Sequence, residues 1–151
     1  MSKKIFLSFI FPLTIIIFIL FTKWWIVDVV DGTDGIMYGF PLIYKSPTFA
    51  SSMAEEYFIT ELIIDFIIYL VIITSIIYSI NKFIYEFKFR KIISVFLIVS
   101  SIILISLDLF LAIWPDNMIS LKRDYEIKIK ETGLKFYFGS SESSNFDNYH
   151  K

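Results

Sequence analysis

Three long apolar stretches constrain this chain more than any other feature of its sequence. They cover Ile5–Phe21, Ile59–Ile80 and Ile92–Trp114. Each is close to the roughly 20 residues that a helix needs to cross a hydrocarbon layer. We therefore expect a membrane protein, mainly α, with three transmembrane helices embedded in the lipid bilayer.

The composition supports a membrane class and excludes several kinds of chemistry. Hydrophobic residues make up 56% of the 151 residues, and the mean hydropathy is +0.69. A net charge of −1 gives no electrostatic reason to expect a nucleic-acid partner. The absence of cysteine removes thiolate catalysis and thiolate metal sites. The single histidine, His150, is next to the last residue, so a histidine-based site is not expected.

The distribution of basic residues predicts the topology. Lys3 and Lys4 precede the first stretch, and residues 81–91 carry four basic side chains against Glu86 alone. Residues 23–57 hold more acidic than basic side chains. Because short cytoplasmic flanks are enriched in Lys and Arg, the N-terminus is predicted inside and the C-terminus outside. We expect a multi-pass protein of the cell (inner) membrane, and the heavy use of Ile, Phe, Lys and Asn is typical of an AT-rich bacterial genome.

This topology divides the chain into three helices, two extracytoplasmic segments and one cytoplasmic loop. In order, the predicted segments are transmembrane helix 1 as an uncleaved signal anchor (1–22), an extracytoplasmic loop with a β-hairpin (23–52), transmembrane helix 2 (53–80), a basic cytoplasmic loop (81–91), transmembrane helix 3 (92–114), and an extracytoplasmic tail with a β-hairpin and a disordered end (115–151).

Aromatic and proline positions refine the predicted spans. Trp24, Trp25 and Trp114 all fall at the outer boundary, where indole rings anchor a protein at headgroup level. Pro12 lies inside the first stretch, and its missing N–H predicts a bend in that helix.

Two hairpin signals flank the second and third spans. In the first loop, β-branched and aromatic residues lie on both sides of two Asp-Gly pairs, and Pro41 is expected to end the pairing. In the tail, alternating residues 125–130 and 134–138 are separated by Glu131-Thr132-Gly133, which predicts a second hairpin. We expect a small extracytoplasmic element of about four strands, because a lone two-stranded ribbon is marginal in water.

The start of the second helix has its own signal. Ser52 followed by Glu55 matches a capping box, with the serine at the N-cap and the glutamate at the third helical position. This pattern predicts a helix that begins at Met53, several residues before the apolar run. Glu55 and Glu56 would then stabilise the positive end of the helix dipole.

Carboxylates inside the spans are the main candidates for a functional site. Asp65 and Asp108 each lie about six residues from the outer end of a span, and Glu61 is one turn from Asp65. The three would form an acidic cluster in the outer leaflet. No basic residue lies in any span. Three interpretations stay open: local capping or hydrogen bonding, a contact with a partner protein, and proton or cation handling.

Other sites are not expected. Asp28, Asp31 and Asp34 resemble an oxygen-rich cation loop, but their spacing is not that of an EF-hand, and Asp-Gly turns explain them. The sequence has no phosphate-binding glycine loop, zinc-ligand spacing or catalytic triad. We predict no metal, no cofactor and no catalytic residue.

Two functional hypotheses follow. The first is a non-catalytic subunit or accessory (assembly) factor of a larger membrane complex, bound to other membrane proteins or to itself. The alternative is a homo-oligomeric transporter or ion or proton pathway that uses the intramembrane carboxylates. A membrane enzyme, with outer-leaflet acids as acid–base groups, ranks third.

Overall fold

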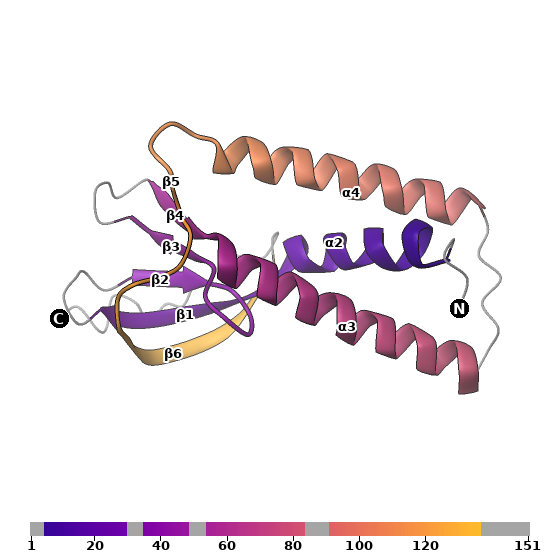
Figure 1. Ribbon diagram of the computed structural model, residues 1–151, viewed down its shortest axis with the longest axis horizontal. Helices are drawn as coiled ribbons and strands as arrows, with labels where there is room; N and C mark the ends of the chain where they lie inside the picture. The colour runs from indigo at the N-terminus through magenta and orange to yellow at the C-terminus, as the bar shows by residue number, and fades with distance from the viewer. Residues whose placement is uncertain (1–4, 30–34, 49–53, 84–90, 137–151) are drawn as a thin grey trace. The chain divides into compact units, whose positions relative to one another are not determined.

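The computed structural model describes residues 5–29, 35–48, 54–83 and 91–136. The chain forms two compact units, which we treat separately. The helical unit comprises Met1–Ile19 and Phe66–Leu111, and the sheet unit comprises Leu20–Asp65 and Ala112–Lys151. Figure 1 draws both units.

The helical unit consists of apolar helices that pack through aliphatic and aromatic side chains. Its helices are the π-helix η1 (Phe6–Ile10), α2 (Phe11–Leu20), α3 (Ile59–Phe83) and α4 (Lys91–Ala112). Ile10 packs with Ile73 and Ile77 of α3 in a buried cluster. Edge-to-face contacts of Phe18 with Phe66 and Tyr69 extend this packing.

The first helix changes its geometry at the predicted proline. Pro12 cannot donate a backbone hydrogen bond, and the turn before it is π-helical, with the Phe11 N–H donating to the Phe6 carbonyl. Single π-helical turns are a known cause of irregularity in helices. The predicted disturbance at Pro12 therefore takes the form of a widened turn.

Among the residues that the structure describes, two helices, not three, are long and apolar enough to cross a membrane. These are α3, with 25 residues, and α4, with 22 residues. The first apolar helix, Phe6–Leu20, is shorter, because strand β1 begins directly at Phe21. The three-span part of the predicted fold is therefore not confirmed.

The β-structure is larger than the predicted small hairpin element. In the described part of the chain, six strands form one mixed sheet in the order β5-β4-β3-β2-β1-β6, in which only the β4–β5 pair is parallel. The strands are β1 (Phe21–Val29), β2 (Gly35–Tyr38), β3 (Lys45–Pro47), β4 (Glu55–Phe58), β5 (Met118–Ser120) and β6 (Ile127–Phe136).

The hairpin predicted in the first loop is confirmed. Strands β1 and β2 pair antiparallel, with Trp25 opposite Met37 and Ile26 opposite Ile36. Strand β2 ends at Tyr38, three residues before Pro41, as expected from the missing N–H of proline. The turn itself, with Asp31 and Asp34, lies outside the described residues.

The hairpin predicted in the tail is wrong, because β6 is one continuous strand paired along the whole of β1. A bulge places Lys130 as an extra residue between Ile129, opposite Val27, and Glu131, opposite Ile26. The bulge shifts the alternation by one residue, which brings Leu134 to the same face as Ile129. In the sequence alone, this change in the phase of the alternation resembles a turn between two strands.

Gly133 has a packing role in this strand. It lies opposite Trp24, and a Cβ added at Gly133 would collide with the Trp24 indole ring. The glycine that suggested a turn instead leaves space for an aromatic side chain of the neighbouring strand.

The helix start predicted from the capping box is also wrong. Glu55–Phe58 form strand β4, and α3 begins at Ile59; Ser52 lies outside the described residues. Strand β4 pairs on both sides, with β3 and β5. The Glu55 N–H donates to the Asn117 side chain at 2.8 Å. These long-range hydrogen bonds override the local helix signal.

The sheet unit has its own hydrophobic core. Val27, Val29, Met37 and Ile43 are buried together, and Tyr125 packs against them with Trp25 and Ile127. The tail contributes Tyr125 and Ile127 to this packing and extends the same sheet as β6.

Candidate functional site

Asp65 is the most constrained charged residue in the sheet unit. Its side chain is 0% exposed although it lies on α3, as the seventh residue of the helix. One carboxylate oxygen accepts the Phe40 N–H at 2.8 Å, and the other accepts the Leu42 N–H at 2.9 Å. Both oxygens of Asp65 therefore hold the backbone of one loop, residues 39–42, which we call the proline loop.

The proline loop is also fixed from the side of strand β1. The Gly39 N–H donates to the Lys23 carbonyl at 3.0 Å, and the Gly39 carbonyl accepts the Trp25 indole N–H at 2.7 Å. Gly39 has a φ of 146°, and a Cβ there would collide with the Leu42 carbonyl oxygen. Only glycine fits this position. The following Phe40–Pro41 peptide bond is cis.

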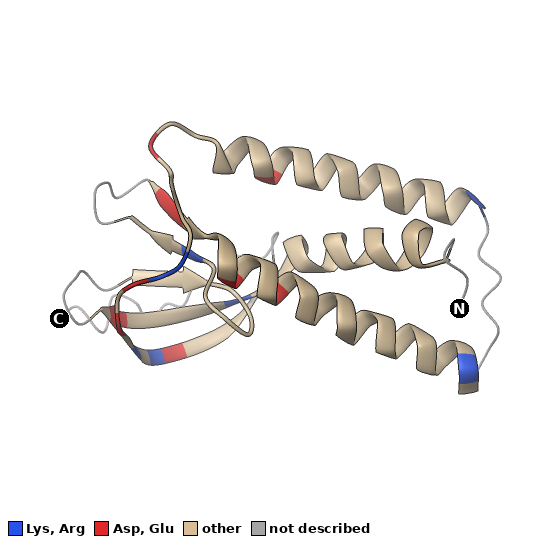
Figure 2. Ribbon diagram, viewed as in Figure 1, with Lys and Arg blue, Asp and Glu red and all other residues tan. Residues whose placement is uncertain are grey.

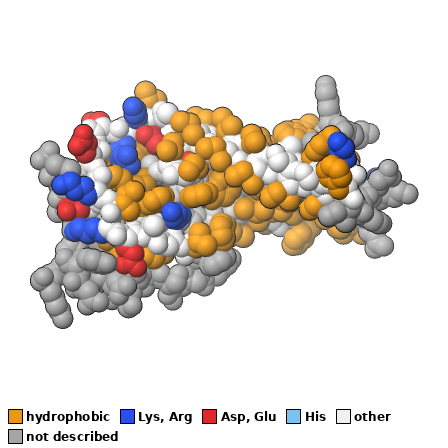
Figure 3. Space-filling view, turned by 90° about the horizontal axis from the view of Figure 1, so that it is seen from below, with side chains coloured by type: hydrophobic (Ala, Val, Ile, Leu, Met, Phe, Trp, Pro, Cys, Tyr) orange, Lys and Arg blue, Asp and Glu red, His pale blue; other side chains and the backbone are white. Residues whose placement is uncertain are grey.

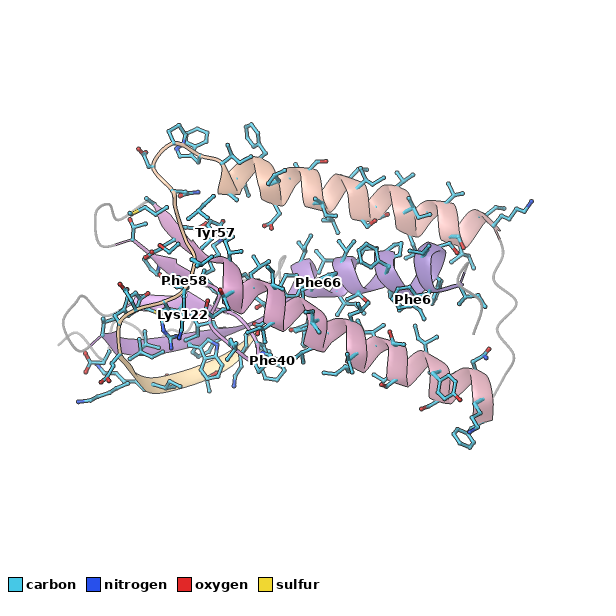
Figure 4. The ribbon with its side chains drawn as sticks, viewed as in Figure 1. Phe6, Phe40, Tyr57, Phe58, Phe66 and Lys122 are labelled. Carbon is cyan, nitrogen blue, oxygen red and sulfur yellow. The ribbon has the colours of Figure 1, made fainter. Side chains whose placement is uncertain are left out.

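A single cation lies over the aromatic side chains at the base of this loop. The Lys23 ammonium is 3.9 Å from the centre of the Trp25 ring and 5.7 Å from the centre of the Phe40 ring. Such contacts are favourable cation–π geometries. The proline loop thus contacts both the buried Asp65 carboxylate and the Lys23 ammonium group. Figure 4 labels Phe40 in this loop.

The start of α3, which carries Asp65, is fastened by the segment after α4. The Leu121 carbonyl accepts both the N–H and the hydroxyl of Thr60, at 3.0 and 2.7 Å. Ser120 donates to the carboxylate of Glu56 on strand β4. Because the first N–H groups of a helix lack partners within it, these contacts complete the end of α3.

Glu61 lies one turn before Asp65 and has a different environment. One carboxylate oxygen accepts a long hydrogen bond from the Arg123 N–H, at 3.4 Å. The other oxygen is buried and has no hydrogen-bond partner among the described residues. Glu61 and Asp65 both lie on α3, one turn apart, and the acidic cluster that includes them stays a prediction.

Asp108 lies in the helical unit, on α4, and its side chain is exposed. The acidic cluster was expected to include it, and that part stays a prediction. Of the three interpretations of the acids, local hydrogen bonding has direct support at Asp65, whose two oxygens are both used.

The predicted interface tryptophans differ in their surroundings. Trp24 and Trp25 lie on strand β1 and make contacts within the sheet unit, Trp24 with Gly133 and Trp25 with Gly39. Trp114 follows α4 and is exposed. Their role as membrane-interface anchors stays a prediction.

Hydroxyl groups in the apolar helices bond within their own helix. Ser75 donates to the Val71 carbonyl, Ser101 to the Ile98 carbonyl and Ser106 to the Ile102 carbonyl. Bonding to a preceding carbonyl satisfies a hydroxyl without any partner helix.

Sequence reasoning missed the proline loop as the partner of Asp65. Gly39-Phe40-Pro41 carried a usable signal, since glycine and proline around one aromatic residue indicate a tight turn. The 25 residues that separate Phe40 from Asp65 gave no sign of the contact. Within the described ranges, no group of three or more His, Cys, Asp or Glu residues is placed to hold a metal ion.

Comparison with known proteins yields no match: no family model matches the chain, and no curated protein or solved structure matches it.

Proposed function

We propose that this chain is a small integral membrane protein that acts as a non-catalytic accessory subunit or assembly factor of a membrane complex. In this proposal α3 and α4 cross the cell membrane and the sheet unit lies on its extracytoplasmic side. The single observation that carries the proposal is the exposure of α4, in which only 6% of an apolar stretch of 18 residues is buried. An apolar helix with so little cover within its own chain requires lipid or protein around it.

The distribution of charge supports membrane insertion. Charged side chains gather over the strands, whereas most of α3 and α4 carries none (Figure 2). The visible helical surface is largely hydrophobic (Figure 3). Away from the helix ends, backbone hydrogen bonds within each helix satisfy the polar main-chain groups that would face the hydrocarbon.

The edge of the sheet supports a protein partner. Strand β6 is last in the strand order, and its apolar residues Ile129 and Leu134 are each 53% exposed. A long edge strand with exposed apolar side chains is a site at which another chain adds a strand.

The proposal is tested by gentle detergent extraction of the tagged chain from its native membrane, with mass spectrometry of the chains that co-purify. A stoichiometric second protein is the expected result, and a stable partner-free monomer would contradict the accessory role. Ile129→Lys on strand β6 should reduce the recovery of that partner. Leu121→Lys, which adds the same charge at an exposed position outside the strands, serves as the matched control.

The alternative, a homo-oligomeric carboxylate pathway, requires acids that exchange protons or cations. The hydrogen bonds that occupy both Asp65 oxygens argue against that use of Asp65. A clean homo-oligomer in the extraction, with flux in liposomes that Asp65→Asn and Asp108→Asn abolish, would favour this alternative over the accessory role.

A further inference from the structure

The proline loop carries three consecutive apolar residues on its surface. Phe40 is 41% exposed, Leu42 is 38% exposed, and Pro41 between them is also exposed. A loop tip with this composition is unusual in contact with water, where tips are commonly polar.

The backbone donors of the same tip are all satisfied within the sheet unit. The Gly39 N–H bonds to Lys23, the Phe40 and Leu42 N–H groups bond to Asp65, and Pro41 has no N–H. An irregular segment is tolerated at membrane depth only where its polar backbone groups have protein partners. The two bonds to Asp65 thus remove the cost of taking the Phe40 and Leu42 N–H groups out of water.

The depth of the tip follows from its attachment to Asp65. That residue is the seventh of α3, and the neighbouring Ile63 and Ile64 are exposed apolar side chains of the same unit. Because the proline loop is hydrogen-bonded to Asp65, it lies in the same medium, lipid or water, as this turn of α3.

The neighbouring cation fits the polar boundary of a bilayer. Lys23 extends over the Trp25 ring, with its ammonium close to the Phe40 ring as well. A lysine stem over aromatic rings, with its charge at the edge of an apolar tip, suits the zone where phosphates meet acyl chains.

We propose that the proline loop inserts Phe40, Pro41 and Leu42 among the acyl chains of the extracytoplasmic leaflet, held at that depth by Asp65. The occupant of this surface is lipid, with Lys23 facing a lipid phosphate. Asp65 is a positioning residue in this arrangement. The inference rests on the proposed insertion of α3 in the membrane.

The experiment uses nitroxide labels on single cysteines, which need no other change because the chain has no cysteine. Phe40→Cys reports on the tip, Pro47→Cys on an exposed strand position, and Ile72→Cys on the exposed surface of α3. Each full-length variant is placed in vesicles of phosphatidylethanolamine and phosphatidylglycerol. Collision rates with oxygen, which partitions into hydrocarbon, and with a water-soluble nickel chelate are then compared.

We expect the ratio of oxygen to nickel collisions at residue 40 to exceed that at residue 47 several-fold and to approach that at residue 72. A ratio at residue 40 equal to that at residue 47, with a high ratio at residue 72, would overturn the loop insertion alone. Low ratios at all three positions would instead contradict the insertion of α3. Low collision rates with both reagents at residue 40 would mean that protein, not lipid, covers the tip, and would also overturn the inference.

The role of Asp65 is tested in the Phe40→Cys background. Asp65→Ala should lower the oxygen-to-nickel ratio at residue 40, because the freed N–H groups favour water. Asp108→Ala, the matched loss of a carboxylate in the helical unit, should leave it unchanged. An unchanged ratio in Asp65→Ala would refute the positioning role.

Discussion

Asp65 shows how backbone groups can solvate a buried acid that has no cationic partner among the described residues. Its charge is solvated by two backbone N–H groups, a substitute for water that also fixes a loop. The sequence predicted that an acid at this depth would need compensation. It could not predict the donor, because backbone N–H groups are not visible in residue identities and the loop is distant in sequence.

Replacing Asp65 should loosen the proline loop in proportion to the bonds lost. Asp65→Ala leaves two buried N–H groups without partners, which we expect to cost about 3 kcal/mol in the free energy of unfolding of the sheet unit. Asp65→Asn keeps one acceptor oxygen and should cost less. Hydrogen exchange at the Phe40 and Leu42 amides measures the effect directly. Equal exchange in Asp65→Ala and in the control Asp108→Asn would contradict it.

The burial of Tyr125 predicts that the stability of the folded protein changes at alkaline pH. Burial raises the pKa of its hydroxyl above the ordinary tyrosine range, although the hydrogen bond to the Ser46 hydroxyl, 3.0 Å away, partly offsets this effect. The folded protein therefore holds this proton more tightly than the unfolded chain. The resulting stability is complete below the ordinary tyrosine pKa of about 10 and is lost as pH rises beyond it.

Tyr125→Phe tests this assignment. The variant lacks the hydrogen bond to Ser46, so its free energy of unfolding at neutral pH should be about 1 kcal/mol lower than that of the wild type. Its unfolding temperature should then fall less steeply than that of the wild type above about pH 10. Parallel pH profiles for the two proteins, followed by near-ultraviolet circular dichroism in detergent, would refute the role of Tyr125.

At the scale of elements, the errors of sequence reasoning have one common cause. The apolar helices and the β1–β2 hairpin were predicted because their signals are local, in periodicity and turn residues. Strand β4 and the continuous β6 were missed because each depends on a partner far along the chain. Glu55 satisfies a capping pattern locally, yet its N–H is used by Asn117.

The bulge in β6 gives a direct test at this scale. Deleting Lys130 makes Ile129 and Glu131 consecutive in the chain. Their partners on β1, Val27 and Ile26, are already consecutive, so the pairing can continue without a bulge. We therefore expect this deletion to be tolerated. Loss of the ion pair between Lys130 and Asp28 should lower the free energy of unfolding by about 1 kcal/mol or less.

Deleting Lys128 is the matched control. It would move Ile129 to the opposite face of the sheet, because strand positions alternate between faces. We expect a clear drop in unfolding temperature for this deletion only. Equal losses for the two deletions would contradict the proposed register of β6.

At the scale of the whole molecule, the chain joins a sheet with its own core to apolar helices, of which α4 is largely exposed. The sequence predicted the membrane class from hydropathy. Its three-span prediction is not confirmed, since two helices of the described residues are long and apolar enough to span, and apolar composition does not show where a helix ends. The first apolar stretch gives way to strand β1 at Phe21, and that strand pairs with two others.

The central claim, that α3 and α4 cross the membrane with the sheet unit outside, is tested most directly by cysteine labelling in intact cells. A membrane-impermeant maleimide is applied to Pro47→Cys in the sheet unit and to Lys91→Cys at the start of α4. We predict labelling of residue 47 in intact cells and labelling of residue 91 only after the membrane is permeabilised. Equal labelling of both residues in intact cells, or release of the protein by alkaline carbonate, would contradict the account.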